Sequence, residues 1–242
     1  MKNYRIVLGY DGTDFRGWQR QPDGRTVQGV LEEAIRKVTQ KRTVVHGAGR
    51  TDAGVHALGQ VASFRGAFKL ADSDLFRALN AVLPADVRVF SLGEAPPGFH
   101  ARRSARSKLY RYRIVHAPQA SPLERRYVLH WPYPLKLGAM REAARLFVRT
   151  ADFTAFSSNR DRSPVRTVTR SELRRSGPEI IYAIEAEGFL RYMVRTIVGT
   201  LLEVGRGRIS PAQVEDIFRL RDRSLAGPTA AAKGLTLVRV DY

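Results

Sequence analysis

Residues 42–64 read RTVVHGAGRTDAGVHALGQVASF and contain two β-strand patterns separated by a glycine-rich connection. Strands are predicted over Arg42–His46 and Gln60–Phe64, because short runs rich in β-branched and aromatic residues, bounded by glycine, are typical of strands. The connection between them is too long for a tight hairpin. The stretch therefore forms the middle of a larger unit, and the segments on either side decide which one.

Those flanking segments predict a strand and a helix before the pair, and a helix and a strand after it. Apolar residues alternate over 4–10, which indicates a strand. An apolar stripe over 27–38, preceded by the N-cap residue Thr26, indicates a helix. A second stripe over 75–82 and an alternating run over 87–92 complete the order β-α-β-β-α-β.

The second half of the chain repeats this order. The predicted elements are a strand over 110–115, a helix over 137–147, a hairpin of 165–175 and 179–187 turning at 176–178, a helix over 189–204 ending at Gly205, a helix starting at Ser210-Pro211-Ala212-Gln213, and a strand over 235–240. We predict an α+β protein of two ferredoxin-like (split β-α-β) units, residues 1–105 and 106–242. Their sheets are expected side by side, with helices on one face and a basic cleft on the other.

The charge of the chain gives the first indication of function. Lysine and arginine number 41 against 23 acidic residues, for a net charge of +18, and 34 of the 41 are arginine. The planar arginine fork binds two phosphate oxygens and stacks on bases, so this composition predicts a nucleic-acid-binding protein. The less favoured alternative is a compositional bias of the kind found in heat-adapted proteins, with which the low asparagine content is compatible.

Several classes of function are disfavoured by what the chain lacks. Without cysteine there is no disulfide, thiolate metal site or thiol nucleophile, which fits a cytoplasmic protein. No apolar run reaches the ~20 residues of a membrane span, and no leader pattern precedes the first strand. The five histidines lack metal-ligand spacing, and no glycine-rich nucleotide-binding motif occurs. We expect no metal, no cofactor and no membrane association.

Asp52 is the leading candidate for chemistry. It lies in the connection 47–60, whose four glycines let the backbone bend sharply and approach a ligand. Arg50, two positions earlier, favours the ionised carboxylate, which can act as a nucleophile or base. An Asx-turn, in which the carboxylate only fixes the loop, explains these residues equally well.

Cationic and aromatic side chains suited to RNA occur elsewhere in the chain. Candidates for contact with phosphates and bases are Arg102, Arg106 and Arg111 around Tyr110, and Arg16, Gln19 and Arg20 in the loop 15–25. The alternative for the first group is a solvated strand edge, and Trp18 in the loop is expected to be a packing anchor. Arg195 falls near the buried stripe of the helix 189–204 and needs a carboxylate partner, for which Asp52, Glu185 and Glu203 are candidates.

Six segments in chain order together resemble the TruA-type tRNA pseudouridine synthase family. They are Tyr10-Asp11-Gly12-Thr13, Gly17-Trp18-Gln19-Arg20-Gln21, Gly49-Arg50-Thr51-Asp52-Ala53-Gly54-Val55-His56, Phe99-His100-Ala101-Arg102, Tyr110-Arg111-Tyr112 and Met193-Val194-Arg195. The resemblance extends from about residue 4 to Tyr242. It implies a homodimeric enzyme, without metal or cofactor, that converts uridine to pseudouridine at positions 38, 39 and 40 of the tRNA anticodon stem-loop.

The resemblance also implies roles for individual residues. Asp52 matches the catalytic nucleophile, and whether it attacks the ring C6 or the ribose C1′, or only assists cleavage, stays open. Tyr110 matches the residue that stacks on the flipped uracil, Arg195 the basic residue that pairs with the aspartate, and Arg50 the residue that holds the base extruded. His56 is expected to contribute to substrate binding.

Two other functions would use the same basic surface. An RNA methyltransferase would need a pocket for a nucleotide-type cofactor, and no glycine-rich strand-to-helix turn supplies one. A non-catalytic RNA-binding module would use Asp52 only as a turn residue. Incubation with unmodified tRNA, without a methyl donor, separates these two from the synthase.

Overall fold

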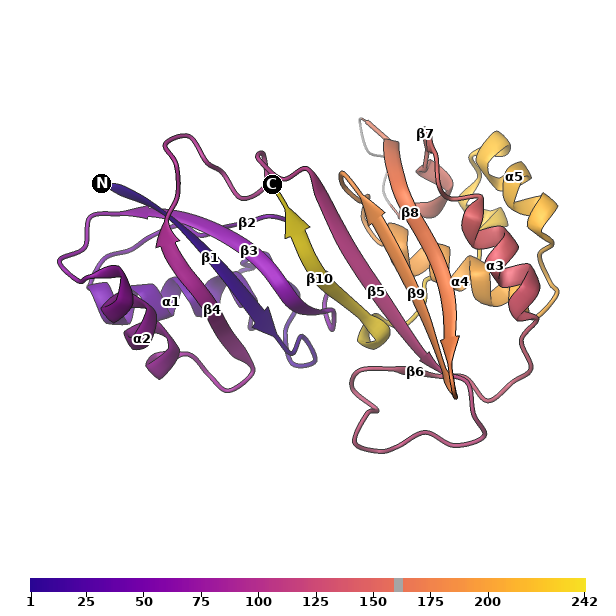
Figure 1. Ribbon diagram of the computed structural model, residues 1–242, viewed down its shortest axis with the longest axis horizontal. Helices are drawn as coiled ribbons and strands as arrows, with labels where there is room; N and C mark the ends of the chain where they lie inside the picture. Colours follow the sequence, from indigo (N-terminus) through magenta and orange to yellow (C-terminus); the bar gives the residue numbers. More distant parts are fainter. Residues whose placement is uncertain (159–162) are drawn as a thin grey trace. The chain divides into compact units, whose positions relative to one another are not determined.

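The computed structural model describes residues 1–158 and 163–242 (Figure 1). The chain divides into two compact units, one of Met1–Arg106 with Thr236–Tyr242 and the other of Ser107–Leu235. Both units combine helices with mainly antiparallel strands, so the predicted α+β class is confirmed. Within the described ranges, no helix has the length and apolar character needed to cross a membrane.

The first unit is built around a central strand. Its elements are β1 (Lys2–Tyr10), α1 (Val27–Thr39), β2 (His46–Gly47), β3 (His56–Gly66), α2 (Asp72–Val82), β4 (Val87–Glu94) and, from Thr236 on, β10 (Leu235–Asp241). β1 lies between β3 and β4 and is antiparallel to both. β2 is antiparallel to β3, and β10 runs parallel to β3 where Thr236 and His56 are paired.

The two helices of this unit form where the sequence predicts them. The hydroxyl of Thr26 accepts a hydrogen bond from the Gly29 amide and caps α1, whose apolar stripe includes the buried Leu31 and Ile35. α1 packs against α2, and α2 packs against β4. Ile6 on β1 is fully buried in the same core. Each such side chain contributes about 1.5–3 kcal/mol by leaving water.

The predicted strand Arg42–His46 is wrong in its extent. Only His46 and Gly47 pair with β3. The backbone of Val45 is bound instead by side chains of α1, because its amide donates to the Glu32 carboxylate at 3.1 Å and its carbonyl accepts from Gln28 at 3.1 Å. These bonds from the side chains of α1 replace the strand pairing that the β-branched residues predicted.

The second unit has its own strands and helices. Its elements are β5 (Ser107–Val115), β6 (Leu129–His130), α3 (Leu137–Arg145), β7 (Thr150–Asp152), η1 (Thr154–Phe156), β8 (Val165–Ser176), β9 (Glu179–Ala186), α4 (Met193–Gly205), α5 (Pro211–Leu220), η2 (Arg223–Leu225) and η3 (Ala232–Gly234). β9 lies between β5 and β8 and is antiparallel to both. The predicted hairpin is confirmed, with Gly177 at a positive φ of 56° in its turn.

The core of the second unit is aromatic. Tyr112 and Tyr182 face one another across β5 and β9, and both are buried. The ring centroids of Phe156 and Phe218 lie 5.0 Å apart within a larger phenylalanine cluster. α3 packs against α4, α5 and β8. The predicted capping box of α5 is confirmed, since the Ser210 hydroxyl and the Gln213 amide oxygen each accept a backbone hydrogen bond.

Two boundaries of α4 differ from the sequence-based expectation. The helix starts at Met193 rather than Phe189, because Tyr192 takes a left-handed conformation (φ 61°) that a helix cannot include. Gly205 is the last helical residue rather than a C-cap. A Cβ there would lie 2.6 Å from the sulfur of Met140, so this glycine permits close packing of α4 on α3.

Candidate active site

The backbone around Asp52 is held at several consecutive positions. The Ala48 amide donates to the Val61 carbonyl at 2.7 Å, and the Thr51 carbonyl accepts from the Trp18 amide at 3.0 Å. The Asp52 carbonyl accepts from the Val55 amide at 3.2 Å and closes the turn that leads into β3. The turn is therefore fixed by main-chain bonds that do not use the Asp52 carboxylate.

Three buried side chains support the same turn. The Tyr10 hydroxyl lies 2.8 Å from the Thr51 hydroxyl, and the Gln60 amide nitrogen donates to the Gly49 carbonyl at 2.9 Å. The same nitrogen is 3.4 Å from the Tyr10 oxygen. Burial raises the pKa of Tyr10 to about 12, so its hydroxyl stays protonated at neutral pH.

The segment 11–18 packs directly on the turn, and two glycines make this approach possible. A Cβ on Gly12 would lie 2.0 Å from the Val55 carbonyl oxygen, closer than any real contact. Gly17 has a φ of +88°, and a Cβ there would lie 2.6 Å from the Thr51 carbonyl oxygen. Trp18 is 2% exposed and packs against Gly47, so the predicted packing anchor is confirmed.

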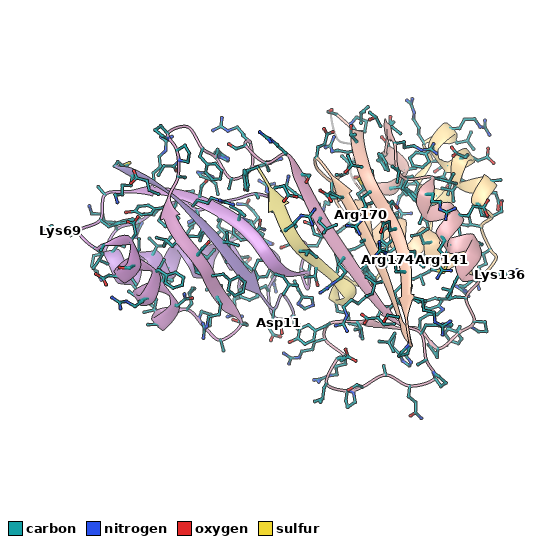
Figure 2. The ribbon with its side chains drawn as sticks, in the orientation of Figure 1. Asp11, Lys69, Lys136, Arg141, Arg170 and Arg174 are labelled. Carbon is teal, nitrogen blue, oxygen red and sulfur yellow. The ribbon has the colours of Figure 1, made fainter. Side chains whose placement is uncertain are left out.

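The side chains of the turn differ in exposure. Asp52 is half-buried, and Arg50 is exposed. His56 is buried at the start of β3, where its Nδ1 accepts from the Gly12 amide at 3.0 Å and lies 3.1 Å from a carboxylate oxygen of Asp11. Figure 2 labels Asp11 at the end of β1. His56 thus links the turn to the segment after β1.

The predicted binding residues of the loop 15–25 lie beside α1. Arg20 is exposed and pairs with Glu32 at 3.0 Å. Gln19 donates to the side chain of Gln28 at 2.9 Å. Arg16 is exposed, with its guanidinium 3.4 Å from the Asp23 carbonyl. The loop therefore presents two guanidinium groups to solvent.

In the second unit, Tyr110 and Arg195 belong to one neighbourhood. The Tyr110 ring is 7% exposed and meets Phe189 edge-on at 5.2 Å. It shares a face of β5 with Tyr112, whose pKa is raised by burial while the charge of Arg195 opposes the shift. The first turn of α4 therefore brings Arg195 near Tyr112, on the face of β5 that also carries Tyr110.

Arg195 is bound through both its main chain and its side chain. Its Nε donates to the Ala230 carbonyl at 2.8 Å, and its own carbonyl accepts from the Ala230 amide at 3.0 Å. The guanidinium lies over the Tyr192 ring at 4.9 Å. Of the alternative carboxylates, Glu203 pairs with Arg206 and Arg208, and Glu185 accepts from the Ser107 hydroxyl.

The remaining predicted RNA-binding arginines are spread over both units. Arg102 and Arg106 are exposed at the end of the first unit. Arg111 lies on β5 opposite Ala183, and its Nε is buried without a partner among the residues that the structure describes. The same part of the chain contains no cluster of three histidine or carboxylate side chains able to bind a metal ion.

Sequence reasoning singled out Asp52, Arg50 and His56 but missed Tyr10 and Gln60. Tyr10 has an ordinary position in a strand pattern, and neither residue was assigned a role from the sequence. A glutamine in an otherwise apolar strand was the available signal, because a buried amide needs partners. In the structure Gln60 is completely buried.

Comparison with known proteins supplies independent information. A family model described as tRNA pseudouridine synthase matches residues 6–102 and 143–242. A tRNA pseudouridine synthase A from Thermodesulfovibrio yellowstonii is 41% identical over the whole of both chains. One from Geobacillus kaustophilus is 46% identical over 98% of this chain and 93% of its own, and one from Thermoanaerobacter sp. is 44% identical over the whole of both.

Proposed function

Because this chain belongs to the tRNA pseudouridine synthase family, we propose that it isomerises uridine to pseudouridine at positions 38, 39 and 40 of the tRNA anticodon stem-loop, with Asp52 as the catalytic nucleophile and without a cofactor. The N1–C1′ bond of uridine breaks and a C5–C1′ bond forms. The proton on C5 is lost and N1 gains one. The reaction is balanced without an oxidant, reductant or co-substrate.

The role proposed for Asp52 is supported by the hydrogen bonds that fix the backbone of its turn. The backbone of the turn is bound at residues 48, 49, 51 and 52, yet the bond that closes it uses the Asp52 carbonyl. The half-buried carboxylate is therefore carried on a rigid backbone, which suits attack at either C6 or C1′ of the bound nucleotide.

Other residues take roles in holding the base. A base in a stem must leave the stack before a carboxylate can reach it, which costs a few kcal/mol. Tyr110 is assigned to stack on the everted uracil, which returns ~1–3 kcal/mol. Arg50, exposed beside Asp52, is assigned to keep the base extruded. Arg195 is assigned as the basic residue of the reaction, since a guanidinium favours an ionised carboxylate.

The net charge of +18 supports docking of tRNA through its phosphates. Arg16, Arg20, Arg102 and Arg106 are exposed and suit such contacts, while Gln19, His56 and Arg111 belong to the same proposed substrate-binding set. The proposal includes a homodimer that binds one tRNA across both subunits, and a cytoplasmic location, where tRNA is processed.

A ferredoxin-like plan for each unit is also part of the proposal. In the first unit the support is the order β4, β1, β3 with β2 antiparallel to β3. In the second it is the antiparallel set β5, β9, β8, with α3 between β5 and β8 along the chain. Both patterns agree with the split β-α-β arrangement.

The test is incubation of the purified protein with an unmodified tRNA transcript and buffer alone, followed by chemical mapping of pseudouridine. We expect pseudouridine in the anticodon arm at positions 38–40 and at no other uridine. Tight binding without product would contradict catalysis and support an RNA-binding module. Product confined to another arm of the tRNA would contradict the proposed positions.

A further inference from the structure

Tyr10, Thr51 and Gln60 form a buried hydrogen-bonded cluster beneath the backbone of the Asp52 turn. The cluster joins the end of β1, the turn and the middle of β3, because the Tyr10 hydroxyl is 2.8 Å from Thr51 and 3.4 Å from Gln60. Tyr10 is 5% exposed, Thr51 6% and Gln60 0%.

The hydrogen-bond pattern ties this cluster to the main chain of the turn. A carbonyl oxygen only accepts, so the Gly49 carbonyl identifies the Gln60 atom at 2.9 Å as the donating nitrogen. Thr51 is bound twice, through its hydroxyl to Tyr10 and through its carbonyl to the Trp18 amide. The residues immediately before Asp52 are therefore fixed from both β1 and β3.

One polar atom of the cluster lowers the stability of the fold. The Gln60 amide oxygen is buried and has no hydrogen-bond partner within residues 1–158 and 163–242. A buried carbonyl left without a partner destabilises a fold, whereas an apolar side chain of similar size would not. The stability of the fold therefore gives no reason for a glutamine at position 60. Its hydrogen bond to the Gly49 carbonyl does give a reason.

We propose that Tyr10 and Gln60 are positioning residues for the isomerisation, which orient the Asp52 carboxylate by fixing the Gly49–Thr51 backbone. This inference rests on the proposed role of Asp52. A displacement of about 1 Å at a reacting group can lower a rate about 100-fold, so loss of one bond in the cluster slows the chemical step. Binding of tRNA, which depends on exposed cations, is unaffected.

The second unit offers a matched control for Tyr10. Tyr182 is also buried, and its hydroxyl lies 2.8 Å from the hydroxyl of Ser171. Tyr10→Phe and Tyr182→Phe therefore remove the same chemical group from the same kind of hydrogen bond. The two variants should lose similar thermal stability, but only one of the bonds supports the Asp52 turn.

The experiment compares kcat and KM for tRNA, together with melting temperatures, in these two variants. We expect Tyr10→Phe to lower kcat about 10- to 100-fold with KM within about twofold, and Tyr182→Phe to keep the wild-type kcat. Equal kcat values for the two variants at equal stability would overturn the proposal. So would a rise in KM with unchanged kcat for Tyr10→Phe.

A second pair of variants covers the case in which Tyr10→Phe fails to fold. Thr51→Ser keeps the hydroxyl and should retain most of the wild-type kcat, whereas Thr51→Val should lose it. Equal kcat values for these two variants would overturn the proposal. Asp52→Asn, measured alongside, separates this inference from the proposed function. If Asp52→Asn remains active, the role of Asp52 is wrong. If Asp52→Asn is inactive but Tyr10→Phe has the same kcat as Tyr182→Phe, only the positioning role is wrong.

Discussion

The two units hold their candidate catalytic groups in different ways. In the first, Asp52 lies in a turn whose main chain is bound at successive residues and covered by the segment 11–18. In the second, Arg195 lies in the first turn of α4, and its side chain is held by the Ala230 carbonyl and the Tyr192 ring. One group is placed by its backbone and the other by its side chain.

The difference follows from the length of the two side chains. A carboxylate one carbon from the main chain has little reach, so its position depends on where the backbone is. A guanidinium on three methylene groups has many rotamers and must be fixed near its end. The first unit should therefore be sensitive to changes in backbone packing, and the second to changes in the side chain itself.

The largest effect on the free energy of unfolding is expected for Gly12→Ala in the first unit. The new Cβ would lie 2.0 Å from the Val55 carbonyl oxygen, so the backbone must move. We expect the free energy of unfolding, measured by urea denaturation, to fall by about 3 kcal/mol, with loss of turnover in the folded protein. Gly138→Ala in α3 is the control, because nothing lies within 4 Å of its Cβ. An equally mild effect in both variants would contradict tight packing on the turn.

A smaller effect is expected for Arg195→Lys in the second unit. Lysine keeps the charge but has no Nε–H to donate to the Ala230 carbonyl. Stability should fall by about 2 kcal/mol, the typical cost of a lost hydrogen bond to a charged group. Arg219→Lys, an exposed arginine paired with Asp216, should change stability by less than about 0.5 kcal/mol. Differential scanning calorimetry of both variants shows whether the bond from the Arg195 Nε to the Ala230 carbonyl stabilises the fold.

The smallest effect concerns the pH dependence of stability. Burial raises the pKa of Tyr10 from 10.0 to about 12. Between these values the unfolded chain releases the proton while the folded chain keeps it, so the free energy of unfolding falls as the pH rises. From pH 10 to 11 this one group should lower the free energy of unfolding by about 1 kcal/mol. Tyr10→Phe should show a correspondingly shallower decline in urea denaturation, and an identical slope would mean that Tyr10 ionises freely.

Much of the fold could be predicted because local signals agreed with the final packing. The alternation in β1, the cap of α1 at Thr26 and the capping box of α5 each specify an element without help from distant residues. The errors occurred where distant side chains intervened. Gln28 and Glu32 bind the backbone of Val45, and Met140 requires the glycine at 205.

The candidate site divides in the same way. Asp52 and Arg50 were found because a glycine-rich connection containing a carboxylate is unusual in itself. The roles of Tyr10 and Gln60 could not be assigned from sequence, since they depend on a cluster that only the folding of β1 against β3 creates. The burial of His56 against Asp11 and Gly12 likewise depends on this contact between segments far apart in the sequence.

The most direct test of the account is the turnover of Asp52→Asn on unmodified tRNA transcript, measured with its tRNA affinity and melting temperature. Because the Asp52 carbonyl closes the turn, the amide variant should fold normally and bind tRNA within about 1 kcal/mol of the wild type. Its turnover should fall more than about a thousand-fold. Turnover within tenfold of the wild type, in a variant that folds and binds normally, would contradict the account.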